Sequence, residues 1–197
     1  MSTDSPFKHL VVKPSGPILG ERKYNNYQET GIFYLSGAID ESTIKPVIEW
    51  ILSENARKEH KKLTLIITSP GGYLYDCFAL LDIMEGSKIP IDTVGLGCIA
   101  SCGFVIFLYG KNRILTPNTF VLSHQYSGGA FGKHHELVAE RKSQDWMHGR
   151  LVKIYAKKTG LSAKKVEEIL LPKSDVILTS EEALKLGVCD EVRLNEF

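Results

Sequence analysis

The chain has 197 residues, a length that fits one domain of ordinary size. Hydrophobic residues make up 43% and charged residues 24%, which is typical of a soluble globular protein. The net charge of +1 gives no electrostatic footprint for nucleic acid or for an anionic membrane. No stretch reaches the roughly 18 apolar residues of a membrane span, and the N-terminus lacks the apolar core of a signal peptide. We therefore expect a cytoplasmic protein.

The cysteine and histidine spacings argue against a metal site. The four cysteines form no C-x-x-C pair and no zinc-finger spacing, so we expect reduced thiols. The segment His135–Ala139 resembles a zinc-peptidase helix, but Ala139 stands where the second histidine ligand must be. The sequence therefore predicts no metal and no cofactor.

The order of the expected elements predicts an α/β fold. Residues 1–30 are rich in turn formers and are expected to form a flexible N-terminal arm, followed by a single domain at 31–197. Strands are expected at 31–38, 63–68, 91–97, 113–115 and 120–122, and helices at 44–52, 77–84, 101–109, 133–158, 162–170 and 180–186. Strands that alternate with helices indicate βαβ units and a mostly parallel sheet covered on both faces.

Two strand-to-helix junctions contain residues that suit acyl chemistry. Gly71-Gly72 follows a strand; it is either a tight turn or a backbone that offers N–H groups to an anion. Ser101 follows the strand at 91–97 and heads an apolar helix. It is either an N-cap or a nucleophile placed at the positive end of a helix. The motif is not the G-x-S-x-G elbow, because residue 99 is Ile99.

His124 closes the next strand and is the candidate base. A lone histidine is usually a packed or solvated residue, but ligands in open α/β sheets bind outside the carboxyl ends of the strands. His124 and Ser101 are expected at the same edge of the sheet. A serine beside a histidine has the residue types of an activated nucleophile and its general base.

Four motifs, in order, resemble one known family. They are T-S-P-G-G (68–72), G-C-I-A-S-C-G (97–103), S-H-Q-Y-S-G-G (123–129) and D-V-I-L-T-S-E-E-A-L-K-L-G-V-C-D (175–190). Together they resemble the proteolytic subunit of the Clp protease, the ClpP family, over roughly residues 31–192. The resemblance implies a crotonase-like spiral of ββα units with a protruding long-helix handle.

The resemblance also implies the roles of single residues. Ser101 matches the nucleophile, His124 the base and Asp175 the acid that orients it. Taken alone, Asp175 is also explained as a solvated loop residue upstream of a helix cap.

Two further sets of residues match the family. The backbone N–H groups of Gly72 and Cys102 match its oxyanion hole. Gly128 and Gly129 fall where the family holds the substrate backbone as an added strand.

The implied function is a serine endopeptidase that hydrolyses unfolded proteins or peptides inside a ring-shaped chamber fed by an AAA+ ATPase. The family forms heptameric rings, often paired. In many members an acidic residue and an arginine couple facing rings, but this chain has Lys173 and Ser174 there. The sequence therefore leaves open whether the protein forms one ring or two. Tyr126 replaces the usual proline after His-Gln. Two alternatives are a non-catalytic ring subunit, which would usually lack a triad residue, and an acyl-CoA-handling crotonase relative, which leaves His124 and Asp175 unexplained.

Overall fold

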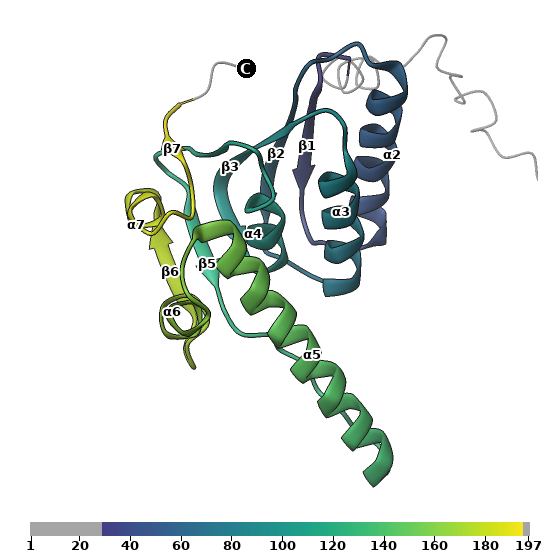
Figure 1. Cartoon of the computed structure of the whole chain (residues 1–197), viewed down its shortest axis with the longest axis vertical. Coiled ribbons are helices and arrows are strands. Elements are labelled where there is room, and N and C mark those ends of the chain that lie inside the picture. The colour runs from purple at the N-terminus through teal and green to yellow at the C-terminus, as the bar shows by residue number, and fades with distance from the viewer. Residues whose placement is uncertain (1–28, 195–197) are drawn as a thin grey trace, which may run out of the picture.

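The computed structural model describes residues 29–194 (Figure 1), so the predicted arm at 1–30 lies almost entirely outside the described residues. The strands are β1 (Ile32–Ser36), β2 (Leu63–Ser69), β3 (Ile91–Ala100), β4 (Arg113–Leu115), β5 (Phe120–Ser123), β6 (Val176–Thr179) and β7 (Glu191–Val192). The helices are α2 (Glu41–Arg57), α3 (Leu74–Gly86), α4 (Cys102–Phe107), α5 (His134–Thr159), α6 (Ala163–Ile169) and α7 (Ser180–Lys185).

The described strands form one sheet, and parallel pairs dominate it. Its order is β1-β2-β3-β4-β7, and β5 pairs with both β3 and β6. Every pair is parallel except β5–β6, which is antiparallel. The predicted α/β class is therefore confirmed, whereas the crotonase-like spiral stays a prediction.

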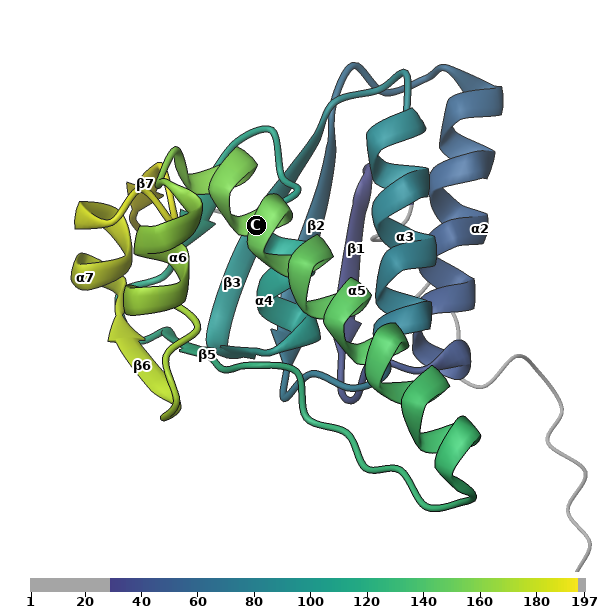
Figure 2. The same cartoon turned by 60° about the horizontal axis from the view of Figure 1, so that its bottom comes forward.

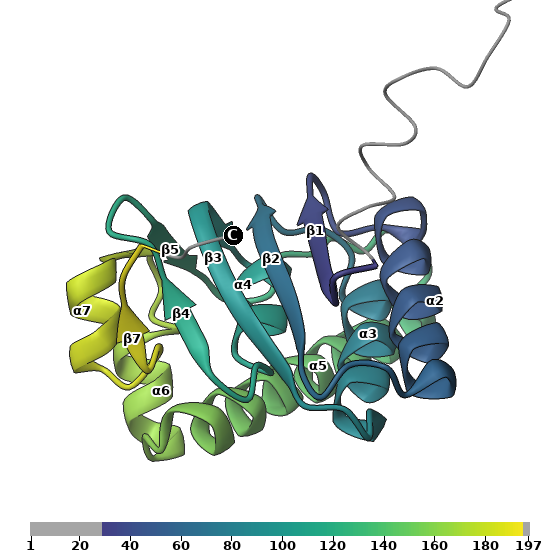
Figure 3. The same ribbon diagram turned by 90° about the horizontal axis from the view of Figure 1, so that it is seen from above.

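Within residues 29–194 the helices lie along one face of the sheet, whereas the sequence analysis expects cover on both faces. On β2, Leu65 and Ile67 are fully buried in the main core, and Figure 3 shows α3, α5 and α6 along that side. Side chains alternate across a strand, so Ile66 points to the opposite face. There it packs with Val94 and Ile114 in a small second cluster.

β3 is longer than the sequence predicts, and this length positions the site. Its first half pairs with β4 through Thr93–Gly95, and its second half pairs with β5 through Cys98–Ala100. The sequence predicts a strand end at Gly97, and Gly97 adopts a φ of 64°, which departs from regular strand geometry. The chain nevertheless continues as strand to Ala100, because β5 supplies a new hydrogen-bonding neighbour.

The longest helix, α5, has 26 residues and is packed only over part of its length. Its buried residues all lie in the second half, from Met147 to Tyr155. Figure 1 shows the first half projecting beyond the sheet, and Figure 2 shows the segment from β5 running out to its start. The predicted long helix is therefore observed; its use as a handle stays a prediction. None of the helices within residues 29–194 is both long and apolar enough to cross a membrane.

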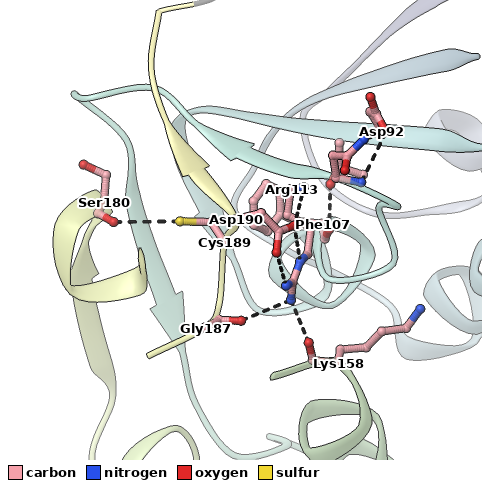
Figure 4. Close-up of polar contacts among 10 residues, drawn as sticks. Asp92, Phe107, Arg113, Lys158, Ser180, Gly187, Cys189 and Asp190 are labelled. Carbon is pink, nitrogen blue, oxygen red and sulfur yellow. Dashed lines mark hydrogen bonds and ion pairs between the residues drawn. The ribbon is translucent and has the colours of Figure 1, made fainter. Parts of the chain in front are cut away.

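The partly buried Arg113 side chain links the C-terminal elements to the sheet (Figure 4). The Arg113 guanidinium binds both carboxylate oxygens of Asp190, at 2.6 and 3.0 Å. Its Nη1 donates to the carbonyls of Lys158 and Gly187, at 2.7 and 3.2 Å. The hydrogen bond from Arg113 lowers the pKa of the Asp190 carboxyl. One side chain thus joins β4 to the end of α5 and to the loop that follows α7.

Candidate active site

Ser101 forms a one-residue turn between β3 and α4. Its backbone has φ 52° and ψ −121°, a region that non-glycine residues rarely adopt. Such a conformation costs on the order of 1–3 kcal/mol and clusters at functional sites. Ser101 occupies the N-cap position of α4, yet its side chain makes no capping hydrogen bond. The hydroxyl therefore does not serve as the helix cap that its position alone suggests.

Neighbouring backbone holds this turn in place. The Ser101 N–H donates to the Leu122 carbonyl of β5 at 2.9 Å, and the Ser101 carbonyl accepts from the Val105 N–H at 3.0 Å. Gly71 lies directly beneath it, with φ 95°. A Cβ added at Gly71 would lie 2.6 Å from the Cβ of Ser101, so the turn needs a glycine there.

His124 shares a pocket with Ser101. It directly follows Ser123, the last residue of β5, and is half-buried. Its Nδ1 lies 2.6 Å from the carbonyl oxygen of the next residue, Gln125. The lining of the pocket comprises Gly72, Leu74, Ser101, Cys102, Val105, His124, Gln125, Tyr126, Ser127, Leu151 and Tyr155. The lining thus combines the serine and the histidine with several apolar or aromatic side chains.

Asp175 is not part of that lining; it directly precedes β6, the strand that pairs with β5. β5 and β6 are antiparallel, with Ser123 opposite Val176. Carrying the register one residue further sets His124 opposite Asp175. The Asp175 side chain is exposed, and within residues 29–194 it makes no hydrogen bond or ion pair. His124 and Asp175 thus flank the last pair of the β5–β6 ladder, and the imidazole contacts the Gln125 carbonyl.

The residues on either side of His124 are anchored to the turn between α6 and β6. The Ser123 hydroxyl donates to the Leu170 carbonyl at 2.6 Å, and the Gln125 side-chain amide donates to the Leu171 carbonyl at 2.9 Å. The buried Tyr155 hydroxyl lies 3.4 Å from the Ser123 oxygen, and burial raises the pKa of Tyr155. Two side chains therefore fix the strand end that carries His124 against the segment that leads to Asp175.

Gly72 and Cys102 also face the pocket. Cys102 is the first residue of α4, so its N–H has no carbonyl partner within the helix. A Cβ at Gly72 would lie 2.2 Å from the Ile39 carbonyl oxygen, which leaves room only for glycine. The Cys102 thiol donates to the Gly72 carbonyl at 3.2 Å and so joins the two loops. The arrangement suits a pair of N–H donors on either side of an anion.

A comparison with known protein families identifies the family to which the chain belongs. The family model described as Clp protease matches residues 20–196. The chain belongs to the Clp protease family. The match spans all four sequence motifs, and family membership indicates a peptidase.

The glycines expected to bind substrate lie beside the pocket of this Clp protease, and not in its lining. Gly128 and Gly129 are exposed and belong to a segment without helix or strand. The Tyr126 ring packs on Gly128, where an added Cβ would lie 2.7 Å from the tyrosine hydroxyl. Tyr126 itself lines the pocket. The departure from proline at this position thus places a ring between the pocket and the glycines.

The sequence does not indicate the residues that anchor the candidate site. Ser123 belongs to the S-H-Q-Y-S-G-G motif, and Tyr155 falls in the helix expected at 133–158. Their partners lie 47 and 32 residues away along the chain. The available signal was the position of Ser123, a small polar residue that ends an apolar strand next to a candidate base.

Proposed function

We propose that this chain is a serine endopeptidase in which Ser101 is the nucleophile, His124 the general base and Asp175 the residue that orients the base. One observation carries the proposal: Ser101 sits in a strained strand-to-helix turn, its hydroxyl makes no cap, and it lines one pocket with His124. A strained turn that presents a serine above the end of a sheet is the arrangement used by other serine hydrolases.

The reaction then follows the usual acyl-transfer sequence. His124 takes the Ser101 hydroxyl proton as the oxygen attacks the peptide carbonyl, a contribution of roughly 10²–10⁴-fold. The N–H groups of Gly72 and Cys102 bind the oxyanion, and each such donor is worth about 2.7–4 kcal/mol. His124 passes its proton to the leaving amine, and water hydrolyses the acyl-enzyme by the same steps in reverse.

Asp175 acts after a rotation of the imidazole. The extended β5–β6 register supports this role, because it sets the backbones of His124 and Asp175 opposite each other. The ring turns away from the Gln125 carbonyl, and its Nδ1–H then donates to the carboxylate, which fixes the tautomer and stabilises the imidazolium. Gly128 and Gly129 hold the substrate backbone as an added strand.

The same proposal extends to the assembly. Copies of this chain form a homo-oligomeric ring of seven subunits that encloses the pockets, and an AAA+ ATPase feeds unfolded substrates into the chamber. Membership of the Clp protease family supports this assembly. Native mass spectrometry distinguishes a monomer, one ring and two rings. A species that stays monomeric at all concentrations would rule out the chamber.

A fluorophosphonate probe tests the chemistry directly. We expect the probe to label the wild type at Ser101 and to leave Ser101→Ala unlabelled. His124→Ala loses labelling, and Asp175→Asn slows it strongly. Ser127→Ala is the matched control, because it removes another serine hydroxyl from the same pocket lining and keeps full labelling. Labelling that survives Ser101→Ala, or wild-type peptide hydrolysis by His124→Ala, would refute the triad.

A further inference from the structure

Two of the four cysteines meet directly behind the candidate active site. Cys77 lies on α3 and Cys102 begins α4, and both are buried free thiols. The Cys77 Sγ lies 3.7 Å from the Cys102 carbonyl oxygen, and the interaction between the two side chains shifts the pKa values of both thiols. The Cys102 thiol in turn reaches the Gly72 carbonyl at 3.2 Å. The contacts of the two cysteines therefore extend to the loop that carries Gly72.

The two thiols are chemically unequal. The hydrogen bond from Cys77 is the main cause that lowers the pKa of Cys102, and the same bond, together with burial, raises the pKa of Cys77. Burial also raises the pKa values of Cys98 and Cys189. Because the thiolate is the reactive form of cysteine, the lowered pKa favours Cys102 as the thiol that reacts first.

Cys102 is also the one that a small molecule in the pocket meets. It belongs to the pocket lining with Ser101 and His124, whereas Cys77 does not, and both cysteines are part of the buried core. A low-pKa thiol at a pocket with a second thiol next to it is the arrangement of redox-sensitive cysteine pairs. Nothing in the proposed peptidase mechanism uses either sulfur.

We propose that Cys102 and Cys77 form a peroxide-sensitive dithiol that closes the active site when oxidised. The Cys102 thiolate attacks hydrogen peroxide; the O–O bond breaks, a sulfenic acid forms on Cys102, and the leaving hydroxide takes up a proton and departs as water. The Cys77 thiol then attacks that sulfur; the S–O bond breaks, the disulfide forms and a second water leaves. The two sulfurs supply the two electrons that reduce the peroxide.

Oxidation removes the hydrogen bond from Cys102 to the Gly72 carbonyl and draws the start of α4 towards α3. This consequence rests on the proposed oxyanion hole, because Gly72 and Cys102 carry its two donors. Loss of one such donor slows acyl transfer roughly 10²–10³-fold. Oxidised protein should therefore react with a fluorophosphonate about 10²-fold more slowly than reduced protein, and a dithiol reductant should restore the rate.

The site itself is tested without any activity measurement. Full-length protein is treated with a small excess of hydrogen peroxide, digested without reduction and analysed by mass spectrometry. We expect a reversible cross-link between the peptides that contain residues 77 and 102. In Cys77→Ser the sulfenic acid on Cys102 is trapped by dimedone. Cys98→Ser and Cys189→Ser are matched controls that form the cross-link like the wild type.

Two results separate this proposal from the proposed function. If Ser101 of reduced protein reacts with the probe but no 77–102 cross-link forms, or if Cys98 is oxidised before Cys102, the dithiol is refuted and the peptidase stands. If the cross-link forms but reduced protein is never labelled at Ser101, the peptidase fails and the dithiol stands.

Discussion

Replacing Gly71 by alanine pushes a methyl group against the Ser101 turn. The added Cβ would lie 2.6 Å from the Cβ of Ser101 and 3.0 Å from the Ala100 carbonyl oxygen. Carbon atoms in contact normally stay about 3.5–4.0 Å apart, so the turn must move by about 1 Å. A misplacement of about 1 Å at a reacting group can cost 10²-fold in rate. We therefore expect fluorophosphonate labelling of Gly71→Ala to fall about 10²-fold.

Gly37→Ala is the matched control for this variant. Gly37 has φ 100°, close to the 95° of Gly71, but no atom lies within 4 Å of a Cβ built there. Both variants therefore carry the backbone cost of a positive φ, about 1–2 kcal/mol. Only Gly71→Ala adds the cost of overpacking, about 1–3 kcal/mol.

Urea unfolding and labelling rates, measured on both variants, separate the two effects. Gly37→Ala should lose about 1–2 kcal/mol of unfolding free energy and keep the wild-type labelling rate. Gly71→Ala should lose more stability and most of the labelling. If Gly71→Ala stays folded and reacts at the wild-type rate, the close packing of Gly71 does not position Ser101, and the reasoning from the turn is wrong.

Gln125→Met removes the donor to the Leu171 carbonyl at nearly constant side-chain size. Peptide hydrolysis should show kcat lowered about tenfold with KM unchanged, because the change affects the placement of His124 and not substrate binding; a change in KM alone would contradict this. Arg113→Met should lower the unfolding free energy at neutral pH, because it removes the guanidinium hydrogen bonds to Asp190 and to two carbonyls and leaves Asp190 only the backbone N–H of residue 113. Arg113 lowers the pKa of Asp190, so the pair's stabilisation is full above the ordinary aspartate pKa of about 3.9 and is lost as the pH falls through the lower folded value. Urea unfolding at several pH values should therefore show the two proteins converging in acid; a constant difference would show that the ion pair is not responsible.

Patterns within short stretches of the sequence were enough to place Ser101 and His124 at strand ends. The periodicity around each residue separates strand from helix, and parallel strands end at a common edge. The strained φ of Ser101 could not be read in this way. It depends on β3 continuing to Ala100, and that continuation depends on pairing with β5, 20 residues later in sequence.

Asp175 shows the opposite limitation. From the sequence, Asp175 is an acidic loop residue upstream of a helix cap. Only the family resemblance assigned it the role of the acid that orients the base. The strand β6 that follows it has four residues and carries no turn signals that would separate it from α7. Its pairing with β5 ends at Ser123 and Val176, next to His124 and Asp175, and that pairing depends on contacts made across the fold.

The uneven packing of α5 has a consequence for local stability. From His134 to Ala139 every side chain of the helix is exposed, so these turns gain no free energy from burial against the rest of the chain. Isolated helical turns are marginal in water, because nucleation is unfavourable and each added hydrogen bond gains little. In an isolated chain the amide hydrogens of these turns should exchange by fraying, while those near Tyr155 exchange only when the core opens. One continuous helix thus contains two regions whose amides differ strongly in protection against hydrogen exchange.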